Sequence, residues 1–221
     1  GCGSNGSSDN NTASNKDATT ISISGSTSVG PLMEKIQEKY ESENSNVTLE
    51  IQQNGSGAGI KDVISGISEV GMSSRELKDD EKTSVQGSIV AYDGIALLVN
   101  TENPVKNISL EDVKKIYTGE ITNWKELGGD DSPIVVVSRE EGSGTRDAFQ
   151  EIVGYESEEL VKDATISDGS GAVKTTVAGN KNAIGFASFE YIDDTVAALN
   201  IDDVEPTADN VKAGSYKISR P

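Results

Sequence analysis

The sequence predicts an α/β protein with a largely parallel sheet in each of two lobes. From Thr20 onward, short apolar strands alternate with Gly/Ser turns and amphipathic helices, which is the pattern of βαβ units. Two apolar stretches, 89–99 and 183–191, could each carry the chain from one lobe to the other, and a two-lobed fold needs two such crossings. A chain of 221 residues can bury one large core or two small ones, which is compatible with two lobes.

The first part of the chain alternates strands and helices. Ile21 and Ile23 alternate with polar residues in a first strand, and Pro31 suits the first turn of the helix that follows. An Asn-Ser-Asn breaker at 44–46 ends that helix. By the same periodicities we expect a strand over 47–51, a helix over 60–67 and a short strand over 70–72.

The second part repeats this order after the strand expected over 89–99. Ser109 is placed to cap a helix whose apolar residues end at Tyr117, and Trp124 is expected to anchor the loop after it. The remaining expected elements are a strand over 134–137, a helix through 148–152, a helix over 171–177 and a strand over 183–187.

The expected lobes are discontinuous in sequence, because the chain crosses between them twice. Lobe I comprises 20–92 and 189–221, and lobe II comprises 93–188. Residues 1–19 hold almost nothing that could join a core, so we expect a flexible polar linker there. Cys2, near the start of this linker, resembles the first residue of a bacterial lipoprotein. We expect a lipid on Cys2 that holds the protein at the extracellular face of the cell membrane, and an incidental cysteine is the alternative.

The composition excludes several classes of function. The net charge of −18 opposes general attraction to nucleic acid or anionic lipid, so any bound anion must be held by local groups. With one cysteine and no histidine, the chain cannot form an intramolecular disulfide, and we expect neither a metal site nor a cofactor. No apolar run approaches the ~20 residues that span a bilayer. We expect a monomer whose only membrane contact is the lipid.

Three strand-to-helix turns are rich in hydroxyl groups. They lie at 25–28, 55–57 and 142–145, and each is expected to begin a helix. Unpaired N–H groups and the positive dipole end of a helix attract anions, glycine lets the backbone come close, and hydroxyls add donors. Arg139, just before the last turn, could supply a guanidinium fork for a tetrahedral oxyanion. The last turn lacks the lysine of a nucleotide-binding loop, which argues against nucleotide hydrolysis.

Four motifs carry a family resemblance: SGSTSVGP at 24–31, NGSGAG at 54–59, GMSSREL at 71–77 and SREEGSGTRDAF at 138–149. With IYTGEITNW at 116–124, they resemble the shorter phosphate-binding lipoproteins of bacterial high-affinity phosphate ABC transporters. The resemblance covers the chain from about Ile21 and implies a two-lobed periplasmic-binding-protein-like clamshell of type II. Each lobe would be a mixed, mostly parallel sheet flanked by helices, with two hinge strands between them. It also implies capture of inorganic phosphate and delivery to ABC transporter permease subunits, without catalysis.

The resemblance also implies a phosphate site residue by residue. Some members of the family have an aspartate where this chain has Ser74, and that carboxylate accepts the phosphate proton that sulfate lacks. Glu141 either substitutes for that carboxylate or orients Arg139. Arg75 is either a ligand or one half of an ion pair. The expected phosphate-binding residues are Ser26, Thr27, Ser28, Ser56, Ser74, Arg75, Arg139, Ser143, Gly144 and Thr145.

Other functions and the extent of the chain stay open. The main rival is a receptor for sulfate or molybdate, followed by a surface adhesin. A phosphoryl-transfer enzyme is disfavoured because histidine and a G-x-S-x-G elbow are absent, although a Ser-Lys pair stays possible. Members of the resembling family continue past the stretch at 216–221 with a strand and a helix that complete the first lobe. We therefore expect either a fragment or an incomplete first lobe.

Overall fold

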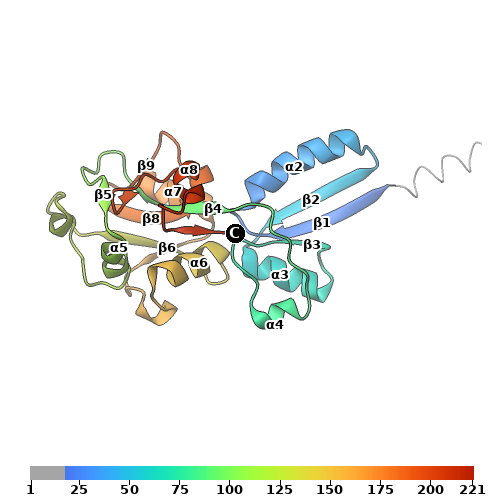
Figure 1. The fold of residues 1–221 in the computed structure, drawn as a ribbon, viewed down its shortest axis with the longest axis horizontal. Coiled ribbons are helices and arrows are strands. Elements are labelled where there is room, and N and C mark those ends of the chain that lie inside the picture. The colour runs from blue at the N-terminus through green and yellow to red at the C-terminus, as the bar shows by residue number, and fades with distance from the viewer. Residues whose placement is uncertain (1–17) are drawn as a thin grey trace, which may run out of the picture. The chain divides into compact units, whose positions relative to one another are not determined.

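The structure, a computed structural model, describes residues 18–221, which divide into two compact units, 18–73 and 74–221. Each unit contains its own sheet flanked by helices (Figure 1). Cys2 and all but the last two residues of the predicted linker lie outside the described residues. Within 18–221, no helix is both long and apolar enough to cross a membrane.

The first unit is built on a three-stranded parallel sheet with the order β2-β1-β3. Its strands are β1 (Thr19–Gly25), β2 (Val47–Gln53) and β3 (Val70–Met72), and its helices are α2 (Gly30–Glu43) and α3 (Ser56–Ser65). The two helices cover opposite faces of this sheet (Figure 1). These elements confirm the strands and helices expected for this part of the chain.

The buried core of the first unit is small. Ile23, Leu49 and Met72 form its fully buried cluster. The apolar stripe expected on the helix over 60–67 is only partly buried, because Ile60 is 4% exposed whereas Ile67, beyond the end of α3, is 69% exposed.

The second unit is built on a six-stranded mixed sheet. The order β11-β4-β8-β6-β7 forms its main path, and β9 also pairs with β4. Strand β6 lies parallel to β7 and β8, whereas β4 is antiparallel to β8, β9 and β11. A separate parallel pair joins β5 to β10.

The strands of this unit are β4 (Asp93–Val99), β5 (Asn107–Ile108), β6 (Val135–Arg139), β7 (Thr165–Ser167), β8 (Ala183–Ser188), β9 (Ala197–Ala198), β10 (Asn200–Ile201) and β11 (Ser219–Arg220). Its α-helices are α4 (Asp79–Lys82), α5 (Leu110–Tyr117), α6 (Gly144–Val153), α7 (Ser170–Ala178) and α8 (Ala208–Lys212). Short 3-10 helices are η1 (Trp124–Leu127), η2 (Ser157–Glu159) and η3 (Phe189–Tyr191). The α/β class is thus confirmed in both units, with all-parallel pairing in the first sheet and mixed pairing in the second.

Successive residues of β4 face two different cores, as the two-residue period of a strand requires. Ile95 and Leu97 belong to the larger core, which includes residues of α5 and α6. Ala96 and Leu98 belong to the smaller core, which includes residues of α7. The sheet is therefore covered by helices on both faces.

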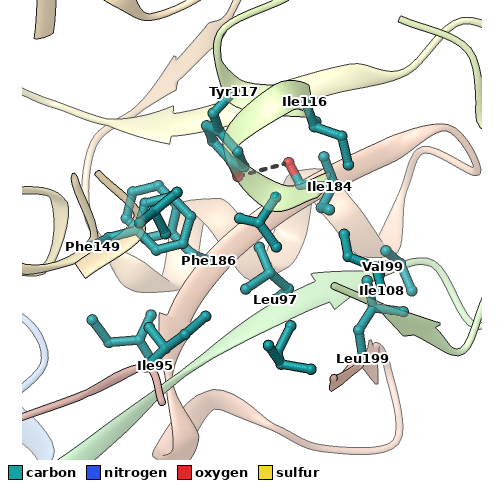
Figure 2. Close-up of a cluster of buried hydrophobic side chains, with 14 of the residues drawn as sticks. Ile95, Leu97, Val99, Ile108, Ile116, Tyr117, Phe149, Ile184, Phe186 and Leu199 are labelled. Atoms are coloured by element: carbon teal, nitrogen blue, oxygen red, sulfur yellow. Dashed lines mark hydrogen bonds between the residues drawn. The ribbon is translucent and has the colours of Figure 1, made fainter. Parts of the chain in front are cut away.

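The larger core fixes α6 against the sheet (Figure 2). Phe149 of α6 stacks on Phe186 of β8 with ring centroids 4.0 Å apart, and Tyr117 meets Phe149 edge-on at 5.0 Å. The Tyr117 hydroxyl donates to the carbonyl of Val137 at 2.9 Å. These contacts hold the start of α6 close to the end of β6, where the candidate site lies.

One expected strand is shorter in the structure. The strand expected over 89–99 begins only at Asp93, and Ile89 and Val90 are 66% and 69% exposed. Apolar side chains alone do not make a strand, and within 18–221 no neighbouring strand pairs with 89–92. In addition, 74–92 and 189–221, which were assigned to lobe I, belong to the second unit. The lobe boundaries stay a prediction.

Candidate functional site

In the first unit, two of the predicted hydroxyl-rich turns meet at Gly25. The Gly25 carbonyl accepts hydrogen bonds from the N–H groups of Asn54 at 3.0 Å and Gly55 at 2.9 Å. Gly25 has a φ of 135°, and a Cβ there would lie 2.2 Å from the carbonyl oxygen of Met72. Only glycine allows this close approach to β3, and the carbonyl of the same residue joins the turns at 25–28 and 55–57.

The hydroxyl of Ser26 caps the start of α2. Its oxygen accepts hydrogen bonds from the N–H groups of Ser28 at 3.0 Å and Val29 at 3.2 Å. Since this oxygen acts as an acceptor, its single O–H remains a donor. Ser26, Ser28 and Ser56 are buried, and Thr27 is half-buried. The predicted residues of this unit therefore belong to closely packed helix starts.

A half-buried carboxylate also ties these turns together. The Ser24 hydroxyl donates to Asp62 Oδ2 at 2.7 Å, and the Asn54 amide donates to the same oxygen at 3.2 Å. Ser24 comes just before the first turn, Asn54 just before the second, and Asp62 lies on α3. The two turns are thus connected by side chains as well as by the backbone.

In the second unit, Arg139 ends β6 and is only 1% exposed. The carboxylate of Glu140 binds its Nε at 2.7 Å and its Nη2 at 3.0 Å, and Ser170 Oγ accepts from its Nη1 at 3.1 Å. These bonds use three of the five N–H donors of a guanidinium. The plane of the guanidinium is thereby fixed from two sides before any ligand binds.

The carboxylate beside Arg139 is that of Glu140, whereas the sequence had suggested Glu141 for an orienting role. Glu141 is exposed. Burial alone would raise the pKa of the Glu140 carboxyl. The hydrogen bond and charge of Arg139, together with the backbone N–H of Gly169, outweigh burial, so the pKa lies below its ordinary value. Glu140 is therefore ionised and balances the charge of Arg139. A role for Glu141 as acceptor of the ligand's proton stays a prediction.

Ser170 belongs to a fourth Gly-Ser turn that sequence reasoning missed. The tetrapeptide Gly-Ser-Gly-Ala occurs at 55–58 and again at 169–172, in each case at the start of a helix. Gly55 has φ 98° and ψ 153°, and Gly169 has φ 96° and ψ 159°, so the two turns share one backbone conformation. This repeat of four residues is the signal that could have identified Ser170.

The start of α6 brings several predicted residues together. Ser143 caps the helix by accepting from the N–H of Arg146 at 3.1 Å, and Gly144 and Thr145 form a buried first turn. Ser74 Oγ lies 3.5 Å from Thr145 Oγ1. Ser74, Ser143 and Thr145 are thus neighbours although about 70 residues separate the first from the others.

Arg75 takes part in an ion pair, which was one of its two predicted roles. Its Nη1 and Nη2 bind the carboxylate of Glu81 at 2.7 and 2.9 Å, and its Nε lies 3.2 Å from Asp147 Oδ2 on α6. The hydrogen bond from Arg75 lowers the pKa of Glu81 to about 2. A direct role of Arg75 in ligand binding stays a prediction.

All arginines of the chain gather around the end of β6 and the start of α6. Only four of the 19 basic residues are arginines: Arg75, Arg139, Arg146 and Arg220. Arg146 is held by neutral acceptors, Gln150 Oε1 at 3.0 Å and the Arg139 carbonyl at 2.9 Å. Arg220 donates to Thr145 Oγ1 at 2.8 Å. In a chain with a net charge of −18, four guanidinium groups thus gather near a helix N-terminus, although carboxylates lie beside three of them, and guanidinium donors suit an oxyanion.

Comparisons with known proteins show the family to which the chain belongs. Residues 10–221 match the family model described as "PBP superfamily domain". The chain is 39% identical over 205 residues to "Phosphate-binding protein PstS" of Bacillus subtilis, covering 90% of this chain and 67% of the relative. It is 32% identical to the protein of the same name from Staphylococcus haemolyticus, covering 89% of this chain and 67% of that one.

Solved structures are similar over most of the chain. A putative phosphate ABC transporter substrate-binding protein with bound phosphate from Clostridium perfringens shares 58% identity and a TM-score of 0.91, covering 92% of this chain and 84% of that one. An ABC-type phosphate transport receptor from Vibrio cholerae shares 38% identity and a TM-score of 0.73, covering 91% and 84%.

Proposed function

Because the chain belongs to the PBP superfamily and, within it, to the phosphate-binding proteins of phosphate ABC transporters, we propose that it captures inorganic phosphate for transport. The predicted family and periplasmic-binding-protein-like fold are confirmed by the same matches. We further propose that the captured phosphate is delivered to permease subunits in the membrane and is not chemically changed.

The observation that carries this proposal is the fixed guanidinium of Arg139 at the end of β6. Glu140 and Ser170 hold the Arg139 side chain, and α6, whose first turn presents backbone N–H groups, begins at Gly144 shortly after it in the chain. Groups that are oriented before binding lose little entropy when a ligand arrives. Because Glu140 balances the charge of Arg139, the anion would be held by short hydrogen bonds more than by a long-range field.

The hydroxyls at the helix starts support the same function. The oxygens of Ser26 and Ser143 accept hydrogen bonds from backbone N–H groups, so their O–H groups are left to act as donors. Phosphate oxygens are acceptors and match such donors. The predicted roles of Thr27, Ser28 and Ser56 in phosphate binding rest on the family motifs and on their places at two helix starts.

Ser74 keeps a second ligand in consideration. It lies beside Thr145 at the position where some family members have an aspartate. A carboxylate repels sulfate, which has no proton to share, whereas a hydroxyl can either donate or accept. Sulfate or molybdate is therefore the alternative ligand, and the binding experiment must include both.

The cellular location is also part of the proposal. We propose that a lipid on Cys2 holds the protein at the extracellular face of the cell membrane and that the polar segment after it acts as a spacer. Metabolic labelling with a fatty acid tests this directly. Label should be incorporated by the wild-type precursor and be lost with Cys2→Ala, whereas equal labelling of both proteins would contradict the anchor.

Calorimetric titration of the phosphate-free protein with phosphate, sulfate and molybdate tests the proposed function. The wild type should bind one phosphate per chain, and Arg139→Ala should weaken binding roughly 10- to 100-fold, the effect of losing charge-assisted hydrogen bonds. Lys162→Ala removes one positive charge from an exposed position of the same unit and should bind like the wild type. Tighter binding of sulfate or molybdate would reassign the ligand, and no binding of any of the three would overturn the proposal.

A further inference from the structure

Arg220 reaches the start of α6 from the last strand of the chain. On β11 it pairs with Asp93 of β4, and its side chain is 3% exposed. Its Nη1 donates to the Ser74 carbonyl at 2.9 Å and to Thr145 Oγ1 at 2.8 Å. These partners are 146 and 75 residues away in sequence. A buried arginine thus ends on two residues of the candidate phosphate site.

The bond to Thr145 fixes what the threonine hydroxyl can do. A guanidinium only donates, so Thr145 Oγ1 must be the acceptor in this bond. A hydroxyl has a single O–H, and Arg220 directs that O–H away from the guanidinium. Ser74 Oγ, 3.5 Å from Thr145 Oγ1, is a more distant partner, and either of these two oxygens can be the donor. Arg220 therefore occupies an acceptor position of the Thr145 oxygen and restricts the O–H to donating in other directions.

The charge of Arg220 is only partly balanced. Its Nη2 lies 3.9 Å from Asp93 Oδ2, beyond hydrogen-bond distance, and that oxygen already accepts from the Ser188 hydroxyl. Among residues 18–221, Nη2 has no hydrogen-bond partner. Burial lowers the pKa of Arg220 to about 10, Asp93 opposes this effect and Arg139 adds to it, so the guanidinium stays charged at neutral pH. A buried cation with an incompletely satisfied donor favours an anion nearby.

We infer that Arg220 is a positioning residue of the phosphate site, which holds the Thr145 hydroxyl so that its O–H donates to the bound oxyanion. The inference rests on the proposed function and adds a residue that neither the motifs nor the turns had indicated. Arg220 acts through Thr145, so its contribution to affinity should exist only while the Thr145 hydroxyl is present.

A double-mutant cycle tests this dependence. Phosphate affinity is measured by calorimetry for the wild type, Arg220→Gln, Thr145→Val and the double variant. Each single substitution should weaken binding roughly tenfold, the effect of about one hydrogen bond to a charged group. The double variant should bind about as well as Thr145→Val alone. Thr145→Ser keeps the hydroxyl, so this variant should retain most of the wild-type affinity. Its affinity should also still fall when Arg220→Gln is added.

Two controls separate positioning from other effects. Lys217→Gln removes a positive charge three residues earlier from an exposed side chain and should leave affinity unchanged. Thermal unfolding without phosphate shows which variants are folded. If Arg220→Gln does not unfold cooperatively, Arg220→Lys replaces that variant in the cycle. Lysine keeps the positive charge but lacks the guanidinium fork that donates to two acceptors.

The outcomes are distinct. A folded Arg220 variant with wild-type affinity, or losses that add fully in the double variant, would overturn the positioning role, since Arg220 would then be silent or act independently of Thr145. A wild type that binds no phosphate would overturn the proposed function and this inference with it. Loss of the Arg220 effect in the Thr145→Val background, in a protein that binds phosphate, supports the inference.

Discussion

Arg139 and Ser170, 31 residues apart in sequence, are joined by a hydrogen bond of 3.1 Å from Arg139 Nη1 to Ser170 Oγ. The bond links the end of β6 to the first residue of α7. Glu140 holds the other edge of the same guanidinium. A side chain with four rotatable bonds is thus reduced to one orientation, and the following predictions depend on that orientation.

Replacing Arg139 by lysine should weaken phosphate binding almost as much as replacing it by alanine, roughly tenfold or more. A lysine keeps the charge but cannot form the paired bonds with Glu140 and the bond with Ser170 together. Calorimetry on Arg139→Lys measures the loss. Retention of wild-type affinity would show that charge alone holds the anion.

Ser170→Ala should reduce phosphate affinity by a few-fold, which is less than the effect of Arg139→Ala. The substitution leaves Arg139 in place but lets its guanidinium adopt other orientations. It should also lower stability by about 1 kcal/mol, the usual effect of one lost hydrogen bond. Urea unfolding and calorimetry on the same sample give both quantities. An affinity loss as large as that of Arg139→Ala would mean that Ser170 itself contacts phosphate.

Stability at low pH should depend on the pair of Arg75 and Glu81. The hydrogen bond from Arg75 lowers the pKa of Glu81 from its ordinary 4.5 to about 2. A lowered pKa means that the ionised carboxylate stabilises the fold, fully above pH 4.5, and that this stabilisation disappears as the pH falls toward 2. Between about pH 5 and about pH 2.5, the free energy of unfolding should therefore fall more for the wild type than for Glu81→Gln. Parallel pH curves for the two proteins would contradict the prediction.

Gly59→Ala should destabilise the first unit. A Cβ at Gly59 would lie 2.5 Å from both the Gly25 Cα and the Ser24 carbonyl oxygen, and backbone atoms cannot move aside easily. We expect a loss of about 1–3 kcal/mol in urea unfolding, as is usual for overpacking. Gly171→Ala is the matched control, because it lies in the first turn of α7 with open space around it. It should be neutral or slightly stabilising, and equal effects of the two substitutions would refute the steric explanation.

Local sequence signals predicted most of the fold. The helix expected after Pro31 is α2, and the alternating strand over 47–51 lies within β2. The periodic pattern of each element is contained in its own short stretch of sequence, so the pattern is enough to identify both elements. The strand expected over 89–99 was wrong only over 89–92, because strand formation requires a pairing partner, which a periodic pattern cannot reveal. The two-residue strands β9 and β10 carry too few residues for any period to show.

The site was predictable where its residues share a motif. Ser143 and Thr145 lie in one turn with glycines, and the structure places both at a helix start. Arg220 gave no such signal, because it lies 75 residues from Thr145. Glu140 directly follows Arg139, and within a strand the side chains of successive residues point to opposite faces. The ion pair between these two residues is possible because β6 ends at Arg139.

The salt dependence of phosphate binding tests the central claim most directly, namely that fixed local donors hold the anion in a protein whose net charge is −18. Equilibrium dialysis with radiolabelled phosphate is carried out at about 20 mM and about 200 mM sodium chloride, which span a large change in screening length. The account predicts one saturable site per chain with an affinity that changes only a few-fold between the two conditions. Absence of a saturable site, or an affinity that changes steeply with salt, would contradict it.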